Sequence, residues 1–172
     1  MKNILPPLFV LFLFPLVSSA QDSCKLKKET DAFTHQVKIS TGFVPFNSNG
    51  VQMLLSVDAT STDIDFFIWI KNDGKCFDDQ SMVQINYAGD RLKANFKNTG
   101  SMNCEGAFHF TFRNTAATPS NLQRLSTKQI ASIKLTGNNK TITDVSFTDE
   151  QKQQLMRMVA CVVRDSKTLI KQ

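Results

Sequence analysis

Residues 51–70 read VQMLLSVDATSTDIDFFIWI and contain two successive strand patterns that set the fold class. In the first half, apolar side chains alternate with polar ones, as in a strand with one buried face. The alternating apolar positions are Val51, Met53, Leu55 and Val57. In residues 63–70 one face is entirely apolar, and Phe67 and Trp69 make the other face apolar too. We therefore expect this second strand to lie in the middle of a sheet.

The same alternation continues on the C-terminal side of this stretch. Residues 82–87 and 92–96 predict a hairpin around Gly89-Asp90, and the phenylalanines of residues 107–112 predict a further strand. Residues 133–135 and 142–147 predict another pair that turns at residues 137–139. Ser126, with Gln129 three positions later, predicts the start of a single helical turn.

The clearest helix signal lies at the C-terminal end. Thr148 and Gln151 form a capping box, and Leu155, Met158, Val159 and Val162 follow at the spacing of one helix face. We expect a helix over about residues 149–164, from Asp149 to Arg164. The predicted fold class is α+β, an antiparallel β-sheet or open sandwich of about seven to nine strands with one C-terminal amphipathic helix packed on it.

The N-terminal residues have the composition of a secretory signal peptide. Lys2 supplies a positive charge, residues 4–17 are apolar apart from prolines, and Ser18-Ser19-Ala20 supplies the small residues of a cleavage site. We expect a signal peptide over residues 1–20, a single β-rich domain over residues 21–172, and an exported protein that is periplasmic or extracellular. The apolar run is too short for the roughly 20 residues of a membrane span, and no second one follows, so no transmembrane segment is expected after cleavage.

The charge balance argues against a nucleic-acid partner. Without Lys2 the chain holds 19 basic and 15 acidic residues, and the basic ones are spread along it. The one tight group, Lys25, Lys27 and Lys28, is typical of a solvated chain end.

The four cysteines suit an oxidising compartment, where an even number predicts disulfide bonds. Three pairings of Cys24, Cys76, Cys104 and Cys161 are possible. Because Cys76 and Cys104 flank the predicted hairpin, we favour a bond between them, which leaves Cys24 to join Cys161 on the last helix. A nucleophilic cysteine with His109 as its base is the competing interpretation.

No recognisable catalytic, phosphate-binding or calcium-binding motif occurs. There is no C-x-x-C, and the two histidines lack ligand spacing, so no metal and no cofactor are expected. The acidic residues Asp58, Asp63 and Asp65, and those of the region Asp73–Asp79, are the remaining candidates for chemistry, together with His109. Phe67, Trp69 and Met158 are candidates for lining an apolar ligand site between sheet and helix.

A few short motifs resemble a group of uncharacterised exported proteins of Gram-negative bacteria. They are Cys24, Asp31-x-Phe33-Thr34, Asn103-Cys104-Glu105-Gly106, the segment Leu125–Leu135 and the helix with Cys161. The resemblance implies an envelope location and structural cysteines, but no activity.

Three classes of function stay open. A non-catalytic binding module for a macromolecular partner, in the envelope or outside the cell, is the leading hypothesis, because the aromatics and cysteines have a complete structural explanation. The alternatives are a carrier of a small apolar ligand and a hydrolase that uses His109 or the Asp73–Asp79 region.

Overall fold

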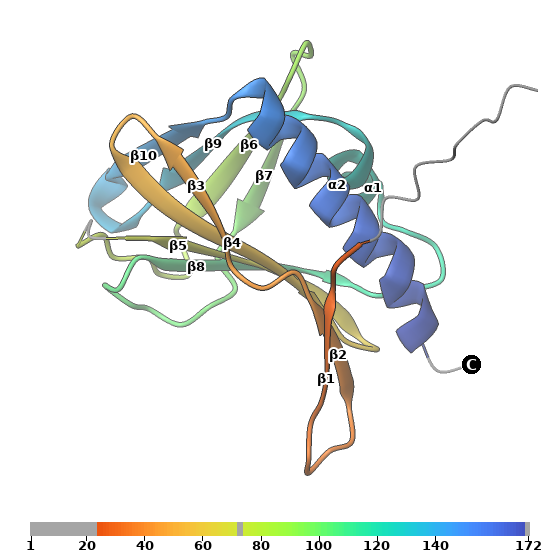
Figure 1. Cartoon of the computed structure of the whole chain (residues 1–172). Helices are drawn as coiled ribbons and strands as arrows, with labels where there is room; N and C mark the ends of the chain where they lie inside the picture. Colours follow the sequence, from red (N-terminus) through yellow and green to blue (C-terminus); the bar gives the residue numbers. More distant parts are fainter. Residues whose placement is uncertain (1–23, 72–73, 171–172) are drawn as a thin grey trace, which may run out of the picture.

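The computed structural model describes residues 24–71 and 74–170. The expected signal peptide, residues 1–20, and Asp73 lie outside the described residues. Within the described part the fold class is confirmed, because antiparallel sheets make up most of the molecule and a C-terminal helix packs on them (Figure 1).

Two antiparallel sheets form the two layers of the fold. The larger sheet contains β1 (Lys27–Thr30), β2 (Val37–Ser40), β3 (Val44–Ser48), β4 (Val51–Ala59), β5 (Asp63–Ile70) and β8 (Ala107–Arg113). The smaller sheet contains β6 (Met82–Tyr87), β7 (Lys93–Lys97), β9 (Ile130–Thr136) and β10 (Ile142–Ser146). In the larger sheet the order is β1-β2-β4-β5-β8, so β5 has a neighbour on each side, as its two apolar faces predicted. β3 pairs with the first half of β4, beside β2 on the same edge.

The described residues contain ten strands, slightly more than the sequence predicted. The additional ones are β1, β2 and β3, in the segment before residue 51. All four residues of β1 are exposed, so no alternation of apolar and polar side chains marks it. Together, β1 and β2 form a hairpin that extends away from the rest of the molecule (Figure 1).

The core lies between the two sheets, which contribute alternate side chains of their strands. Phenylalanines join the layers: Phe96 of β7 stacks on Phe110 of β8 with ring centroids 4.6 Å apart, and Phe46 of β3 meets Phe147 at 5.3 Å. The stripe of phenylalanines in β8 therefore belongs to the core, and its ring-to-ring contacts stabilise the packing of one sheet on the other.

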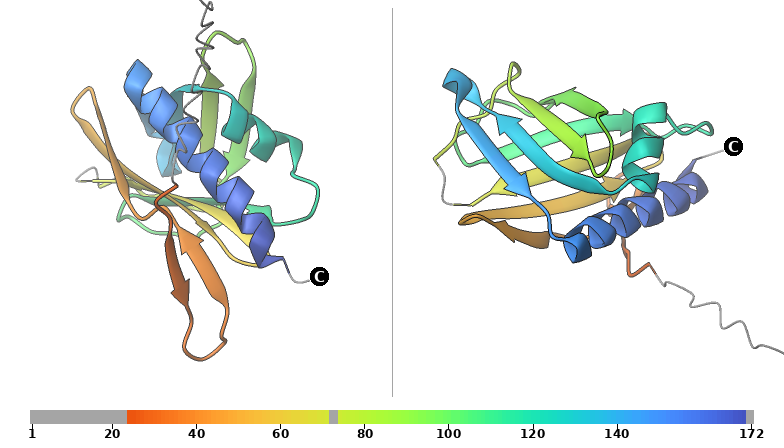
Figure 2. Two further views of the ribbon diagram at one scale, coloured as in Figure 1. Left: turned by 45° about the vertical axis from the view of Figure 1, so that its right-hand side comes forward. Right: turned by 90° about the horizontal axis from the view of Figure 1, so that it is seen from above.

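Helix α2 (Asp149–Ser166) closes one side of the two-layer structure (Figure 2). The predicted capping box is present, with the Thr148 hydroxyl accepting from the Gln151 amide and the Gln151 side chain accepting from the Thr148 amide. The helix contacts β2 and β4 of one sheet and β9 of the other. Its buried side chains are Leu155, Val159, Val162, Val163 and Ser166. The helix ends two residues past the predicted Arg164, and a short 3₁₀ turn, η2 (Lys167–Leu169), follows it.

The predicted helical turn starting at Ser126 is wrong. Helix α1 (Ser120–Thr127) begins after Pro119, and Ser126 lies buried in its last turn, with its hydroxyl donating to the Gln123 carbonyl. Leu122 and Leu125 are buried against α2 and the core. Their burial determines where the helix forms, and the capping pattern at Ser126 does not. The turn between β9 and β10 is a 3₁₀ turn, η1 (Asn138–Lys140).

Both disulfide bonds have the favoured pairing. Cys24 is bonded to Cys161 of α2, with 5.7 Å between their Cα atoms, and Cys76 is bonded to Cys104 on either side of the β6–β7 hairpin. All four cysteines of the chain are thereby bonded. No thiol remains for the nucleophilic role that the sequence left open.

Candidate functional site on the outer face of the larger sheet

The larger sheet has an inner face in the core and an outer face turned away from it. In β5, the side chains of Ile64, Phe66, Ile68 and Ile70 are buried in the core. Successive side chains of a strand point to opposite sides, so Asp65, Phe67 and Trp69 lie on the outer face. Such a face is usually polar when it meets water. Here it combines aromatic and ionisable side chains, which makes it the candidate site.

A row of polar side chains crosses five strands of this face. Pairing between neighbouring strands aligns Lys27 of β1, Ser40 of β2, Asp58 of β4, Asp65 of β5 and Thr111 of β8. Residues directly opposite each other in antiparallel strands point to the same side. The five residues therefore form one continuous line, which we call the polar row.

Two carboxylates stand side by side in the middle of the polar row. Asp58 and Asp65 are directly opposed, an arrangement that like charges disfavour. Each carboxylate has its own partners. The Lys38 ammonium lies 2.7 Å from Asp58, and the Ser40 hydroxyl donates to the same carboxylate. Asp65 is hydrogen-bonded to His109 instead. The hydrogen bond to Asp58 raises the pKa of the Lys38 ammonium above its ordinary value. The pair is thus held in place by neighbours at both ends.

Asp65 is the carboxylate whose ionisation is perturbed. Burial raises its pKa above the ordinary value, and the hydrogen bond with His109 opposes that rise. The Nδ1 atom of His109 lies 3.2 Å from an Asp65 carboxylate oxygen. A carboxylate in this position can orient an imidazole and select its tautomer. Hydrolysis through a protein nucleophile would also need a hydroxyl or thiol hydrogen-bonded to the imidazole. Within the described ranges the ring of His109 hydrogen-bonds to Asp65 alone, so it has no such nucleophile as a partner.

An aromatic cluster of Phe43, Phe67 and Trp69 lies beside the polar row. The Phe67 ring makes edge-to-face contacts with Phe43, at 5.4 Å between centroids, and with His109, at 4.1 Å. The Trp69 indole N–H donates to the Glu105 carbonyl at 2.7 Å, which fixes the orientation of its ring. Trp69 is 37% exposed and Phe43 is 54% exposed. The rings are therefore both accessible and held by protein contacts.

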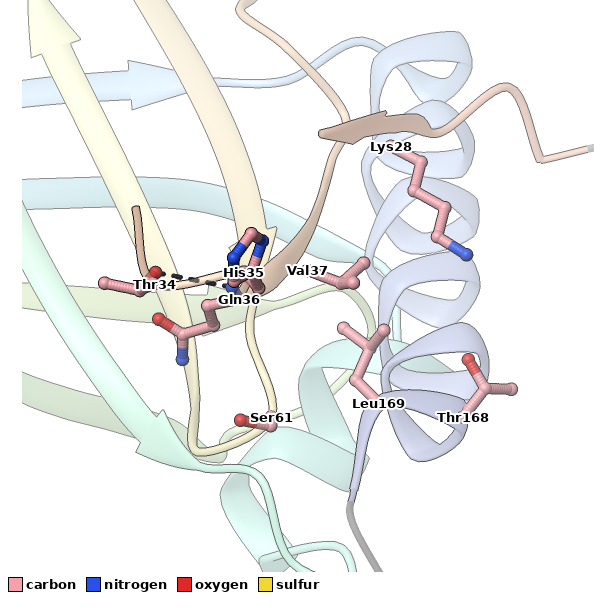
Figure 3. A pocket seen from close by; sticks show the side chains of 8 residues that line it. All are labelled: Lys28, Thr34, His35, Gln36, Val37, Ser61, Thr168 and Leu169. Carbon is pink, nitrogen blue, oxygen red and sulfur yellow. Dashed lines mark hydrogen bonds between the residues drawn. The ribbon is translucent and has the colours of Figure 1, made fainter. Parts of the chain in front are cut away.

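Apart from this face, a hollow of about 520 Å³ lies between the β1–β2 hairpin and the end of α2. Figure 3 shows Lys28 from β1, His35 and Gln36 from the hairpin turn, and Leu169 after α2 around it. It is open to solvent, and most of its side chains come from the β1–β2 hairpin. On its rim the Thr34 hydroxyl accepts from the Gln36 amide, but none of its described lining residues forms an ion pair like those of the outer face, so its chemistry is less defined.

The structure separates the residues proposed to line an apolar ligand site. Phe67 and Trp69 lie on the outer face, whereas Met158 packs against the core and borders a hollow of about 170 Å³ beside the Cys24–Cys161 bond. Neither aromatic residue borders that hollow. The alternation of strand residues decides this, because it places Phe67 and Trp69 on the side of β5 that faces away from α2.

Asp78 and Asp79 form no direct hydrogen bond with the His109 ring in the described residues, although Asn98 binds both the Asp78 carbonyl and the His109 amide. Asp78 forms a local turn in which its carboxylate accepts from Ser81 and from the Gln80 amide, and the hydrogen bond from the Ser81 side chain lowers its pKa. Asp79 is not among the partners of His109. In residues 24–71 and 74–170, no three His, Cys, Asp or Glu side chains are grouped so as to hold a metal ion. None of the helices in those ranges is long and apolar enough to span a membrane.

Sequence reasoning missed part of the site. It named Asp58, Asp65, Phe67, Trp69 and His109, but it did not bring them together on one face. It also missed Lys27, Lys38 and Ser40 of β1 and β2, and Thr111 of β8. Phe43, in the segment between β2 and β3, was missed as well. The alternation in β8 was a usable signal, since it places His109 and Thr111 on the face opposite the phenylalanines.

Comparison of the chain with protein-family models, with curated proteins and with solved structures found no match.

Proposed function

We propose that the chain is a non-catalytic binding module of an exported compartment, periplasmic or extracellular, and that it contacts a macromolecular partner through the outer face of the larger sheet. The single observation that supports this most is the accessible aromatic cluster beside a polar row whose two carboxylates each have a protein partner. Partly exposed Trp and Phe side chains are the usual anchors of recognition surfaces.

The arrangement of the face favours binding over turnover. Its carboxylates and its imidazole are engaged with one another or with Lys38 and Ser40, which suits a surface that presents fixed groups. Side chains that are already ordered lose little conformational freedom when a partner arrives. The two intramolecular disulfides are compatible with an oxidising, exported location. The N-terminal signal pattern and the resemblance to exported proteins of Gram-negative bacteria support the same location.

The experiment is affinity capture by the disulfide-bonded protein, immobilised and exposed to envelope material of its own host. We expect one partner to be recovered reproducibly and to be lost with Trp69→Ala and Phe43→Ser. His109→Ala should weaken the binding without abolishing it, because it removes one contact of Phe67 and one of Asp65. Phe33→Ala is the matched control, because Phe33 is an aromatic side chain that is 93% exposed at the tip of the hairpin, away from the outer face.

Two results would contradict the proposal. One is a partner that binds equally well to Trp69→Ala, provided that this variant unfolds at the same urea concentration as the native protein. The other is turnover of a substrate that His109→Ala abolishes, which would make the Asp65–His109 pair catalytic.

A further inference from the structure

We infer that the partner of the outer face is a neutral glycan, a chain of pyranose sugars lying along the polar row and over the aromatic cluster. This inference rests on the proposed function and specifies its partner. A pyranose ring has an apolar face of C–H groups and a rim of hydroxyl groups. A site for it therefore needs an aromatic surface and, within the width of one sugar, fixed hydrogen-bonding groups.

The aromatic half of this requirement is met by Trp69 and Phe67. Trp69 is oriented by its bond to the Glu105 carbonyl, and Phe67 is held between Phe43 and His109. These contacts come from the protein itself, so the rings need no reorganisation to receive the apolar face of a sugar. Trp69 is 37% exposed and Phe67 is half-buried, so part of each ring is open to a ligand.

The polar half is the row that contains Asp58, Asp65 and Thr111. Along β5, Asp65 and Phe67 are two residues apart on the same side, a separation of about 6.7 Å. A sugar resting on Phe67 therefore extends its hydroxyl groups to the polar row, and a neighbouring sugar of the same chain lies over Trp69, about 13 Å from Asp65 along β5. Carboxylate oxygens are strong acceptors of hydroxyl hydrogens. One oxygen of Asp65 is engaged by His109, and the other has no hydrogen-bonding partner in the part of the chain that the structure describes.

The charges of the row favour a neutral polymer. Lys27 and Lys38 balance Asp58 and Asp65, and Lys38 is paired directly with Asp58. Such a face exerts no net attraction on a polyanion such as a nucleic acid or an acidic polysaccharide. A protein partner is also less suitable, because ionised side chains are depleted from the centres of protein interfaces. Hydroxyl-rich neutral chains use these same groups as hydrogen-bond partners.

Trp69 allows a direct test, because it is the only tryptophan of the chain. The disulfide-bonded protein is titrated with neutral hexasaccharides of β-1,4-linked glucose, α-1,4-linked glucose and β-1,4-linked N-acetylglucosamine. Tryptophan emission and its quenching by acrylamide are recorded. We expect at least one of the three sugars to give a saturable change of emission and to protect Trp69 from acrylamide.

Matched variants decide whether the polar row contributes. Thr111→Val keeps the size of an exposed side chain and removes one hydroxyl, and it should weaken binding by up to about tenfold. Asp65→Ala should weaken it by about tenfold or more, with Trp69 still present to report. Phe33→Ala should leave the affinity unchanged. Circular dichroism and urea unfolding identify any variant that has lost its fold, and Thr111→Val then carries the test.

The outcomes separate this inference from the proposed function. If no hexasaccharide changes the emission or quenching of Trp69, while a protein from the envelope protects it, the glycan is overturned and the binding module stands. If neither sugars nor envelope material protect Trp69, both are overturned. Sugar binding that is unaffected by Thr111→Val and Asp65→Ala also overturns the glycan site on this face.

Discussion

Removing the two disulfide bonds in turn should cost different amounts of stability, because they close loops of very different length. Cys24 and Cys161 are 137 residues apart, and Cys76 and Cys104 are 28 apart. The loop-entropy relation gives about 3.6 kcal/mol for the shorter loop at 25 °C and about 5 kcal/mol for the longer one. The shorter bond lies inside the longer loop, which lowers both costs by the same amount and leaves a difference of about 1.4 kcal/mol between them.

The perturbation is a pair of double variants, Cys24→Ser with Cys161→Ser and Cys76→Ser with Cys104→Ser, so that no unpaired thiol remains. The free energy of unfolding is measured by urea titration for each variant and for the native protein. We expect the loss of Cys24–Cys161 to cost more, and the dependence on urea to become steeper, because the unfolded chain exposes more surface without that bond.

The location of the effect provides a second measurement. Cys24 precedes β1, a strand with four exposed residues that pairs only with β2, and Cys161 lies on α2. Amide hydrogen exchange should therefore become faster in the β1–β2 hairpin when this bond is absent, while β6 stays protected. A larger loss of stability from removing Cys76–Cys104, or unchanged exchange in the hairpin, would refute the reasoning.

Three further predictions concern single residues. Gly106→Ala should cost about 2 kcal/mol or more, because Gly106 has a φ of +82° and an added Cβ would lie 2.3 Å from a backbone oxygen of β5. Gly50→Ala, at a φ of +80° with nothing within 4 Å, should cost less, and equal losses in urea unfolding would contradict the role of the contact. Thr148→Ala should cost about 1 kcal/mol by removing the capping box of α2, measured by thermal unfolding and absent if the helix end is held by packing alone. Because the folded chain raises the pKa of Asp65, the stability from that group is present at low pH and lost as pH rises through the raised pKa. Asp65→Asn should therefore gain stability relative to the native protein as pH rises above the ordinary Asp pKa of 3.8, and urea unfolding showing the opposite slope would contradict the raised pKa.

The candidate site shows where prediction from the sequence stops. The sequence shows that Phe67 and Trp69 give β5 a second apolar face. The local pattern does not show that this face is exposed to solvent, or that Phe43 contacts Phe67. His109 is 44 residues from Asp65, and their contact depends on the register between β5 and β8. A shift of one residue in that register would turn His109 to the core.

The sequence by itself determined the elements with strong local patterns. Alternation with a period of two residues specified β4 and β5, and a capping box followed by an apolar stripe specified α2, because both patterns are set by the geometry of neighbouring residues. The tertiary structure alone decided which strands pair, that β1 and β2 extend the sheet without burying an apolar face of β1, and that Asp58 and Asp65 stand side by side. Those features depend on contacts between residues far apart in the chain, whose free energy is gained only when the two sheets and α2 pack together.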